Sequence, residues 1–327
     1  MAGGKGLVGR LIEKRIKYLY NNAPTTTNMS TSNNKIKVIR LTRGDPITSK
    51  EKEEDEGRVS VRDMKWDGLE VPKEINGKDV HWVINLCGES IGVRPWSRSN
   101  FKSRVLSSRL NPTSTLTEWC SNEGQGATLI TAGGVGVYGF NWRSDDDNKD
   151  IPKESWEGKG DGFLAEVSRQ WEKVAMEGKG GRIVVRLAPV LANGGVLGRM
   201  ILPFKMGLGG RIGDGKQWFP WVSGEDVGRI VVDHIMGGKG GRGEKKIYNV
   251  ISPGRVTNEQ FTKALGSAVN RPTVVPMPGF VVKAAFGEMG EEVLLGGTTC
   301  EPGKLGEEGY EWVHEDVNTA LEWAVRE

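Results

Sequence analysis

Three short apolar runs constrain the fold of this chain of 327 residues more than any other feature. They lie at 83–87, 128–131 and 183–187, and the first two run directly into turns that contain glycine. Continuous apolar runs of this length predict strands that are buried on both faces, as in a parallel sheet. Amphipathic helices are expected between them, at 101–120 and 163–178. This alternation predicts an α/β fold with a doubly wound parallel sheet.

The first nine residues carry glycine at positions 3, 6 and 9, directly in front of an amphipathic helix. Such a GxxGxxG loop allows a tight turn and a close backbone approach, and the helix N-terminus attracts a pyrophosphate. A flexible tail is the alternative, because the chain contains 47 glycines. A phosphate loop needs a buried strand in front of it, and Met1 and Ala2 are too few to form one. We therefore expect the first strand to be missing and the chain to be N-terminally incomplete, with any targeting segment upstream.

The next expected strand, at 36–43, ends in Thr42 and Arg43. An acid at this place holds the ribose 2′-hydroxyl of NAD, whereas an arginine accommodates the 2′-phosphate of NADP. The sequence therefore favours NADP, although Asp45 keeps NAD possible. A solvated arginine at a strand end is the alternative interpretation.

Composition excludes several classes of protein. The formal net charge of +3 is too balanced to indicate nucleic-acid binding. The three cysteines and three histidines are scattered, so we expect no disulfide framework, no metal site and a reducing compartment, either cytoplasm or an organelle stroma or matrix. No apolar run is long enough to span a membrane.

The chain divides into two predicted units. Residues 1–250 form the nucleotide-binding domain, with a polar insertion at 21–34 and a solvated charge run at 50–58. Residues 251–327 form a small C-terminal α/β lobe, with helices expected at 258–269 and 280–286. Near the boundary, Trp218, Phe219 and Trp221 cluster beside Gln217 and Asp226. Such a cluster is typical of a ligand pocket or of a packed interface between lobes.

Longer motifs carry a family resemblance. The most specific lie at 83–89 (VINLCGE), 107–109 (SSR), 186–195 (RLAPVLANGG), 203–210 (PFKMGLGG) and 217–222 (QWFPWV). Together they resemble the short-chain dehydrogenase/reductase superfamily, in the atypical extended branch called the epimerase family, with a small C-terminal domain of unknown function. The resemblance extends from Gly3 almost to the end of the chain.

The resemblance implies a Rossmann-type core that holds NADP(H). It implies pyrophosphate contacts from the glycine loop, namely Gly3, Gly4, Lys5, Gly6, Leu7 and Val8. Arg43 would contact the 2′-phosphate, Thr42 would also belong to the cofactor site, and Leu86, Cys87 and Gly88 would line the adenosine side. Arg109 would approach the cofactor and Val190 its nicotinamide end, while Arg186, Gln217, Trp218 and Trp221 would border the substrate cavity.

One departure from the family is important for catalysis. Reductases of this superfamily use a Tyr-x-x-x-Lys pair, in which lysine lowers the pKa of the tyrosine that passes the proton. None of the five tyrosines here has lysine four residues later, and Gly133 and Gly134 stand where serine is usual. Thr131 and Tyr138 are the remaining candidate catalytic hydroxyls, and a packed, structural Tyr138 is the alternative.

Two functions are therefore open. The first is an NADP(H)-dependent oxidoreductase or epimerase-like enzyme acting on an unknown small molecule, which the aromatic cluster and the closing lobe favour. The second is a non-catalytic NADP(H)-binding protein, such as a regulatory or organelle-division partner, which the missing pair favours. A protein partner or a homo-oligomer is compatible with both.

Overall fold

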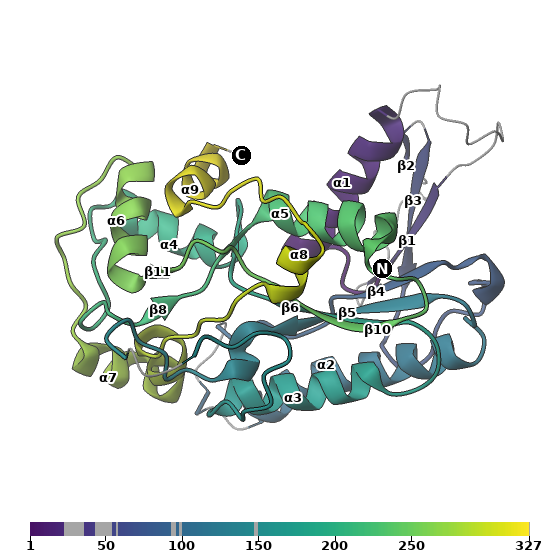
Figure 1. Ribbon diagram of the computed structural model, residues 1–327, viewed down its shortest axis with the longest axis horizontal. Coiled ribbons are helices and arrows are strands. Elements are labelled where there is room, and N and C mark those ends of the chain that lie inside the picture. The colour runs from purple at the N-terminus through teal and green to yellow at the C-terminus, as the bar shows by residue number, and fades with distance from the viewer. Residues whose placement is uncertain are drawn as a thin grey trace.

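The computed structural model describes residues 1–22, 36–42, 54–56, 58–92, 96–97, 100–146 and 150–326. It shows the predicted α/β fold, in which a twisted central sheet has helices on both faces and a smaller lobe beside it (Figure 1). Its core consists mainly of aliphatic side chains from the strands and from the helices on the two faces.

The central sheet contains two sets of hydrogen-bonded strands. One set is parallel, in the order β10–β6–β5–β4, with β4 at Trp82–Asn85, β5 at Thr128–Gly134, β6 at Arg182–Leu187 and β10 at Lys245–Val250. The other set has the order β1–β3–β2, in which β1 (Ile36–Thr42) and β3 (Val59–Lys65) are parallel and β2 (Glu54–Glu56) is an antiparallel edge strand.

Ala2 joins these two sets, because it bridges both Leu41 of β1 and Asn85 of β4. Its backbone N–H donates to Ile84 (2.7 Å), and its carbonyl accepts from Leu86 (2.9 Å). The position that we expected to lack a strand is therefore occupied by Met1 and Ala2. Counting them as the central strand, the order is that of the Rossmann fold, in which the strand order reverses around this position while the strands stay parallel.

Helices cover both faces of the sheet (Figure 1). On one face, α1 (Leu7–Asn22) packs against α5 (Gly224–Arg229) and the π-helical segment η3 (Ile230–Lys239). On the other face, α2 (Phe101–Ser121) packs against α3 (Phe163–Met176).

The second lobe has its own core, and that core changes the predicted domain boundary. It combines α4 (Gly195–Lys205), α6 (Asn258–Ala268) and α9 (Val317–Arg326), with Trp221 fully buried among them. The lobe therefore includes residues from before position 250, so a cut at 250/251 divides one packed unit. The order of the sequence does not indicate this boundary, because α4 precedes position 250 in the chain but packs into the core of the lobe.

Short elements complete the chain. They are the 3₁₀ turns η1 (Gly77–Asp79) and η2 (Val135–Tyr138), the strand pairs β7–β9 (Val190–Leu191, Val222–Ser223) and β8–β11 (Trp218–Phe219, Val256–Thr257), α7 (Gly279–Met289), η4 (Gly290–Leu295) and α8 (Gly303–Glu307).

Two sequence expectations need comment. The charge run at 50–58 is not entirely a loop, because Glu54–Glu56 pairs with β3 at the sheet edge, where charged side chains are tolerated. The polar insertion at 21–34 lies outside the described residues, apart from the two residues that end α1. Among the described helices, none combines the length and apolar character that crossing a bilayer requires.

The C-terminal region is attached to α5 through one buried carboxylate, Asp226. Asp226 has no exposed surface, and it accepts hydrogen bonds from the Ser223 hydroxyl (2.6 Å) and the Tyr310 hydroxyl (2.9 Å). It also accepts from the backbone N–H groups of Val313 (2.8 Å) and His314 (3.1 Å). A buried carboxylate with this many donors is strongly stabilised in its position.

Asp226→Ala should therefore lower the free energy of unfolding by about 3–5 kcal/mol, because several buried donors lose their acceptor at once. Denaturant unfolding followed by circular dichroism measures the change. Glu225→Ala is the matched control, because Glu225 is next to Asp226 in the chain but its side chain is partly exposed. This substitution should change the free energy of unfolding by no more than about 0.5 kcal/mol. Equal effects of the two substitutions would contradict this assignment.

Candidate cofactor site at the carboxyl edge of the sheet

The glycine loop lies between Ala2 and α1, at the carboxyl edge of the sheet. Gly3 adopts φ +71°, and a Cβ there would lie 2.7 Å from the Leu86 carbonyl oxygen. A Cβ on Gly9 would lie 2.2 Å from the carbonyl oxygen of Gly4, so α1 packs onto the loop only because this position is glycine. These are the roles of the first and third glycines in a dinucleotide-binding turn.

A chain of charged side chains runs beside this loop. Lys5 lies 3.1 Å from Asp63 of β3, and Asp63 also pairs with Arg40 of β1 (2.6 Å). Arg40 in turn contacts Glu13 of α1 (3.1 Å). Burial would raise the pKa of Asp63, but hydrogen bonds from Arg40 and Lys5 outweigh it and lower that pKa. The network fixes the loop lysine next to the start of α1.

Thr42 ends β1 with a buried hydroxyl that has no hydrogen-bond partner among the described residues. Buried polar atoms are nearly always paired in folded proteins, so an orphan at a strand end is compatible with a ligand partner. Arg43, the residue predicted for the 2′-phosphate, lies outside the described residues.

Arg109 of α2 packs against the turn that follows β4. Its guanidinium donates to the carbonyls of Glu89 (3.1 Å) and Val105 (2.8 Å) and lies 5.3 Å from the ring centre of Trp171. A Cβ on Gly88 would approach it to 3.0 Å. Burial lowers the pKa of Arg109 to about 10, and the nearby charge of Glu89 opposes that effect. No carboxylate within the described part of the chain forms an ion pair with this arginine.

The other predicted cofactor residues lie around this turn and on the next strands. The Leu86 N–H pairs with Ala2, and the Cys87 N–H donates to the Asn85 side chain (3.1 Å). Val190 is buried in β7, opposite Val222 of β9. The structure therefore gathers the loop, Thr42 and the 86–88 turn at one edge.

Tyr138 does not have the surroundings of a proton donor. Its hydroxyl accepts from Arg186 (2.6 Å) and lies 2.8 Å from the Asn249 amide oxygen, with the Lys153 carbonyl at 3.1 Å. Burial raises the pKa of this phenol well above its ordinary value. The same network keeps the Arg186 side chain away from the predicted substrate cavity, because its guanidinium donates two hydrogen bonds of 2.8 Å to Glu172.

Thr131, the other candidate hydroxyl, faces the α2–α3 side of the sheet. It is in register with Asn85, whose side chain donates to Thr113 of α2 (2.8 Å), and registered neighbours in a sheet point to the same face. The Thr131 hydroxyl is buried and unpaired among the described residues. Its place beneath the helices does not suit catalysis at the strand ends.

The family's catalytic pair usually lies at the start of α3. In this chain, the first backbone N–H groups of α3 are bonded to a glutamate from the C-terminal region. Glu292 of η4 accepts from the backbone N–H groups of Phe163 (2.9 Å) and Leu164 (2.6 Å), and so satisfies two free donors of the helix N-terminus. Burial raises the pKa of Glu292. No local pattern predicts this contact, since the two segments are about 130 residues apart in the chain.

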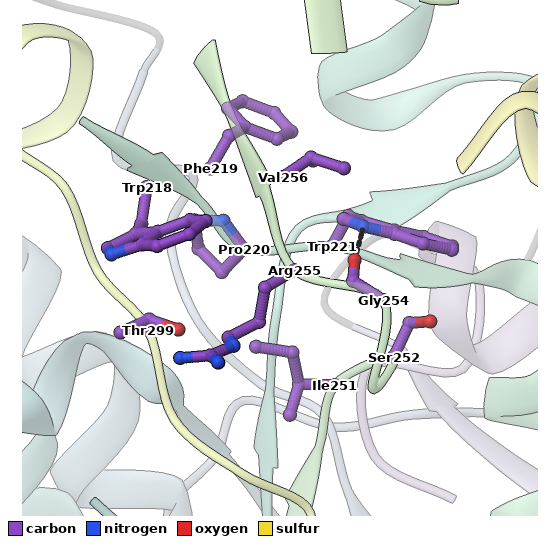
Figure 2. Close-up of a pocket in the computed structure, with 10 residues that line it drawn as sticks. All are labelled: Trp218, Phe219, Pro220, Trp221, Ile251, Ser252, Gly254, Arg255, Val256 and Thr299. Carbon is purple, nitrogen blue, oxygen red and sulfur yellow. Dashed lines mark hydrogen bonds between the residues drawn. The ribbon is translucent and has the colours of Figure 1, made fainter. Parts of the chain in front are cut away.

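The predicted substrate residues do not form one cavity wall, and Figure 2 shows the side chains of Trp218 and Trp221 apart from each other. Trp221 is fully buried in the second lobe, with its indole N–H on the Gly254 carbonyl (2.8 Å). Gln217 is also buried and donates to the carbonyls of Ile212 and Leu294, although its amide oxygen has no partner among the described residues. Trp218 borders an open cavity, with the Arg255 guanidinium 5.4 Å from its ring centre.

Comparisons with known proteins place this geometry in a family. Residues 277–324 match a model described as a domain of unknown function (DUF1731). An epimerase family protein of Mycobacterium bovis is 37% identical over 255 residues, covering 75% of this chain and 79% of that protein. The human epimerase family protein SDR39U1 is 30% identical over 292 residues, covering 85% and 91%.

The crystal structure of human SDR39U1 (isoform 2) with NADPH superposes with a TM-score of 0.73 at 25% identity, over 99% of this chain and 98% of that one. A dTDP-glucose 4,6-dehydratase from Streptomyces venezuelae shares the fold at a TM-score of 0.71 and 17% identity. The glycine turn, the strand order and these matches agree: the chain belongs to the epimerase family proteins, an atypical extended group of the short-chain dehydrogenases/reductases.

Proposed function

We propose that this protein binds NADP(H) at the carboxyl edge of its sheet. The observation that carries the proposal is the glycine loop, set between β1 and β4 with Gly3 and Gly9 in contacts that only glycine permits. The human relative that superposes over almost the whole chain was crystallised with NADPH, which supports the same cofactor here.

The residues present suit such a ligand. The backbone of Gly3–Val8 and the N-terminus of α1 would receive the pyrophosphate. The buried Thr42 hydroxyl, which has no hydrogen-bond partner in the described part of the chain, lies on the side expected for the ribose, and Arg43 follows it in the chain. Arg109, a partly buried cation whose partners among the described residues are carbonyl groups and an aromatic ring, supplies positive charge next to the 86–88 turn.

Bound NADPH supplies a hydride, so the protein's own contribution is to orient a substrate and provide a proton. Neither Tyr138 nor Thr131 is placed for the second task. We therefore favour an oxidoreductase or epimerase-like enzyme whose proton comes from another group or from water. The engaged Tyr138 hydroxyl also favours the second candidate, a non-catalytic NADP(H)-binding partner protein.

Gly9→Ala should weaken NADPH binding at least about tenfold, because the new methyl group would displace the loop from α1. Isothermal titration calorimetry measures the affinity. Gly198→Ala is the control: a Cβ on this glycine of α4 would enter open space, and the substitution should leave the NADPH affinity within about twofold. Unchanged binding in Gly9→Ala would place the cofactor elsewhere.

Arg43→Glu should lower NADPH affinity about 10- to 100-fold, while NADH affinity falls much less, because only NADPH carries the 2′-phosphate. The measurement is the ratio of the two dissociation constants. A variant that keeps the wild-type NADPH affinity would remove the basis for NADP preference.

Tyr138→Phe should lower the free energy of unfolding by about 1–3 kcal/mol, because Arg186 and Asn249 lose a buried partner. Tyr18→Phe, at an exposed position, is the control.

NADPH oxidation is followed in parallel with a panel of aldehydes and ketones. We expect turnover by the wild type to survive in Tyr138→Phe. Turnover lost with no loss of stability would restore Tyr138 as the acid, and binding without turnover across the panel would favour the non-catalytic candidate.

A further inference from the structure

A cavity of about 240 Å³ opens beside Trp218, between the loop after η2 and the second lobe. Its lining comes from distant parts of the chain and combines polar and apolar side chains: Trp142, Arg143, Ser144, Asp146, Ile151, Trp218 and Arg255. We propose that this cavity binds a small organic anion with a flat ring, an aromatic carboxylate, independently of the cofactor loop.

The backbone of Trp218 and the indole of Trp142 are held in place before any ligand arrives. The Trp218 backbone N–H donates to the Trp142 carbonyl (3.3 Å), and the Trp218 carbonyl accepts from the Thr298 backbone N–H (3.3 Å). The Trp142 indole N–H donates to the Tyr138 carbonyl (2.9 Å), and β8 pairs with β11 next to Arg255. Rigid aromatic walls bind flat apolar rings at little cost in conformational entropy.

Arg255 provides the charge. Its guanidinium lies 5.4 Å from the ring centre of Trp218 and forms neither an ion pair nor a hydrogen bond within the described residues. The other charged lining groups are engaged: Arg143 pairs with Asp145 (3.1 Å) and Asp214 (2.5 Å), and Asp146 has a partner in the chain. One cation is therefore left for an incoming anion.

Arg255 borders both the larger cavity and a smaller space on its inner side. Figure 2 shows Arg255 extending along Trp218 toward Thr299, with Ile251 on its other side. The space around this inner side amounts to about 10 Å³, which is roughly the room needed for one water molecule. A ligand can thus approach Arg255 from the larger cavity, where Ile151 adds apolar surface.

The test uses three probes of similar size on the full chain without NADPH. Benzoate has the ring and the charge, benzamide lacks the charge, and cyclohexanecarboxylate lacks the flat ring. We expect benzoate to bind with a dissociation constant of about 0.1–1 mM and the other two at least about fivefold more weakly, measured by calorimetry or ligand-observed NMR.

Two variants locate the site. Arg255→Gln should weaken benzoate binding about tenfold and remove its advantage over benzamide, whereas Arg242→Gln, an exposed arginine elsewhere, should have no effect. Trp218→Leu should abolish the preference for benzoate over cyclohexanecarboxylate, whereas Trp218→Phe should retain that preference. Absence of benzoate binding, equal binding of the three probes, or an unchanged Arg255→Gln would each overturn the proposal.

Discussion

Backbone pairing by the first residues holds the whole sheet together. The Ala2 N–H and carbonyl pair with β4, while the Met1 carbonyl accepts from Leu41 (2.9 Å) and the Gly3 N–H donates to Leu41 (3.3 Å) on β1. These bonds connect the two sets of strands, and they also deliver the glycine loop to the sheet edge. The start of α1, the Leu86 turn and the charges around Lys5 are positioned by the same few contacts, so sheet continuity and the cofactor site depend on one another.

A buried polar network explains why familiar catalytic residue types act structurally here. Arg186 and Glu172 form a two-bond ion pair beneath the strand ends, and removing either partner would leave a buried charge unpaired. One of the remaining N–H groups, on Nη1, donates to the Tyr138 hydroxyl, which also contacts Asn249. This tyrosine therefore completes a structural network. It does not replace the Tyr-x-x-x-Lys pair, which this sequence lacks.

The sequence predicted what depends on local pattern and failed where distant segments meet. The apolar runs at 83–87, 128–131 and 183–187 correspond to β4, β5 and β6, because strands buried on both faces need continuous apolar residues. The glycine spacing predicted the loop, because a tight dinucleotide-binding turn also depends on a local pattern of residues. Trp221 and Arg186 looked like pocket residues, since composition does not distinguish a cavity wall from a core. Their burial depends on α6 and α3, which only the fold brings to them.

The C-terminal region is an integral part of the nucleotide-binding unit rather than a module attached to it. Within residues 277–324, Glu292 satisfies the N-terminus of α3, and the 310–314 segment satisfies Asp226 at the start of α5. These two helices cover opposite faces of the sheet (Figure 1). Loss of this region would leave unpaired helix N–H groups on one face and an unmatched buried carboxylate on the other. The physical reason for keeping this domain of unknown function is therefore already present in the fold, before any substrate is considered.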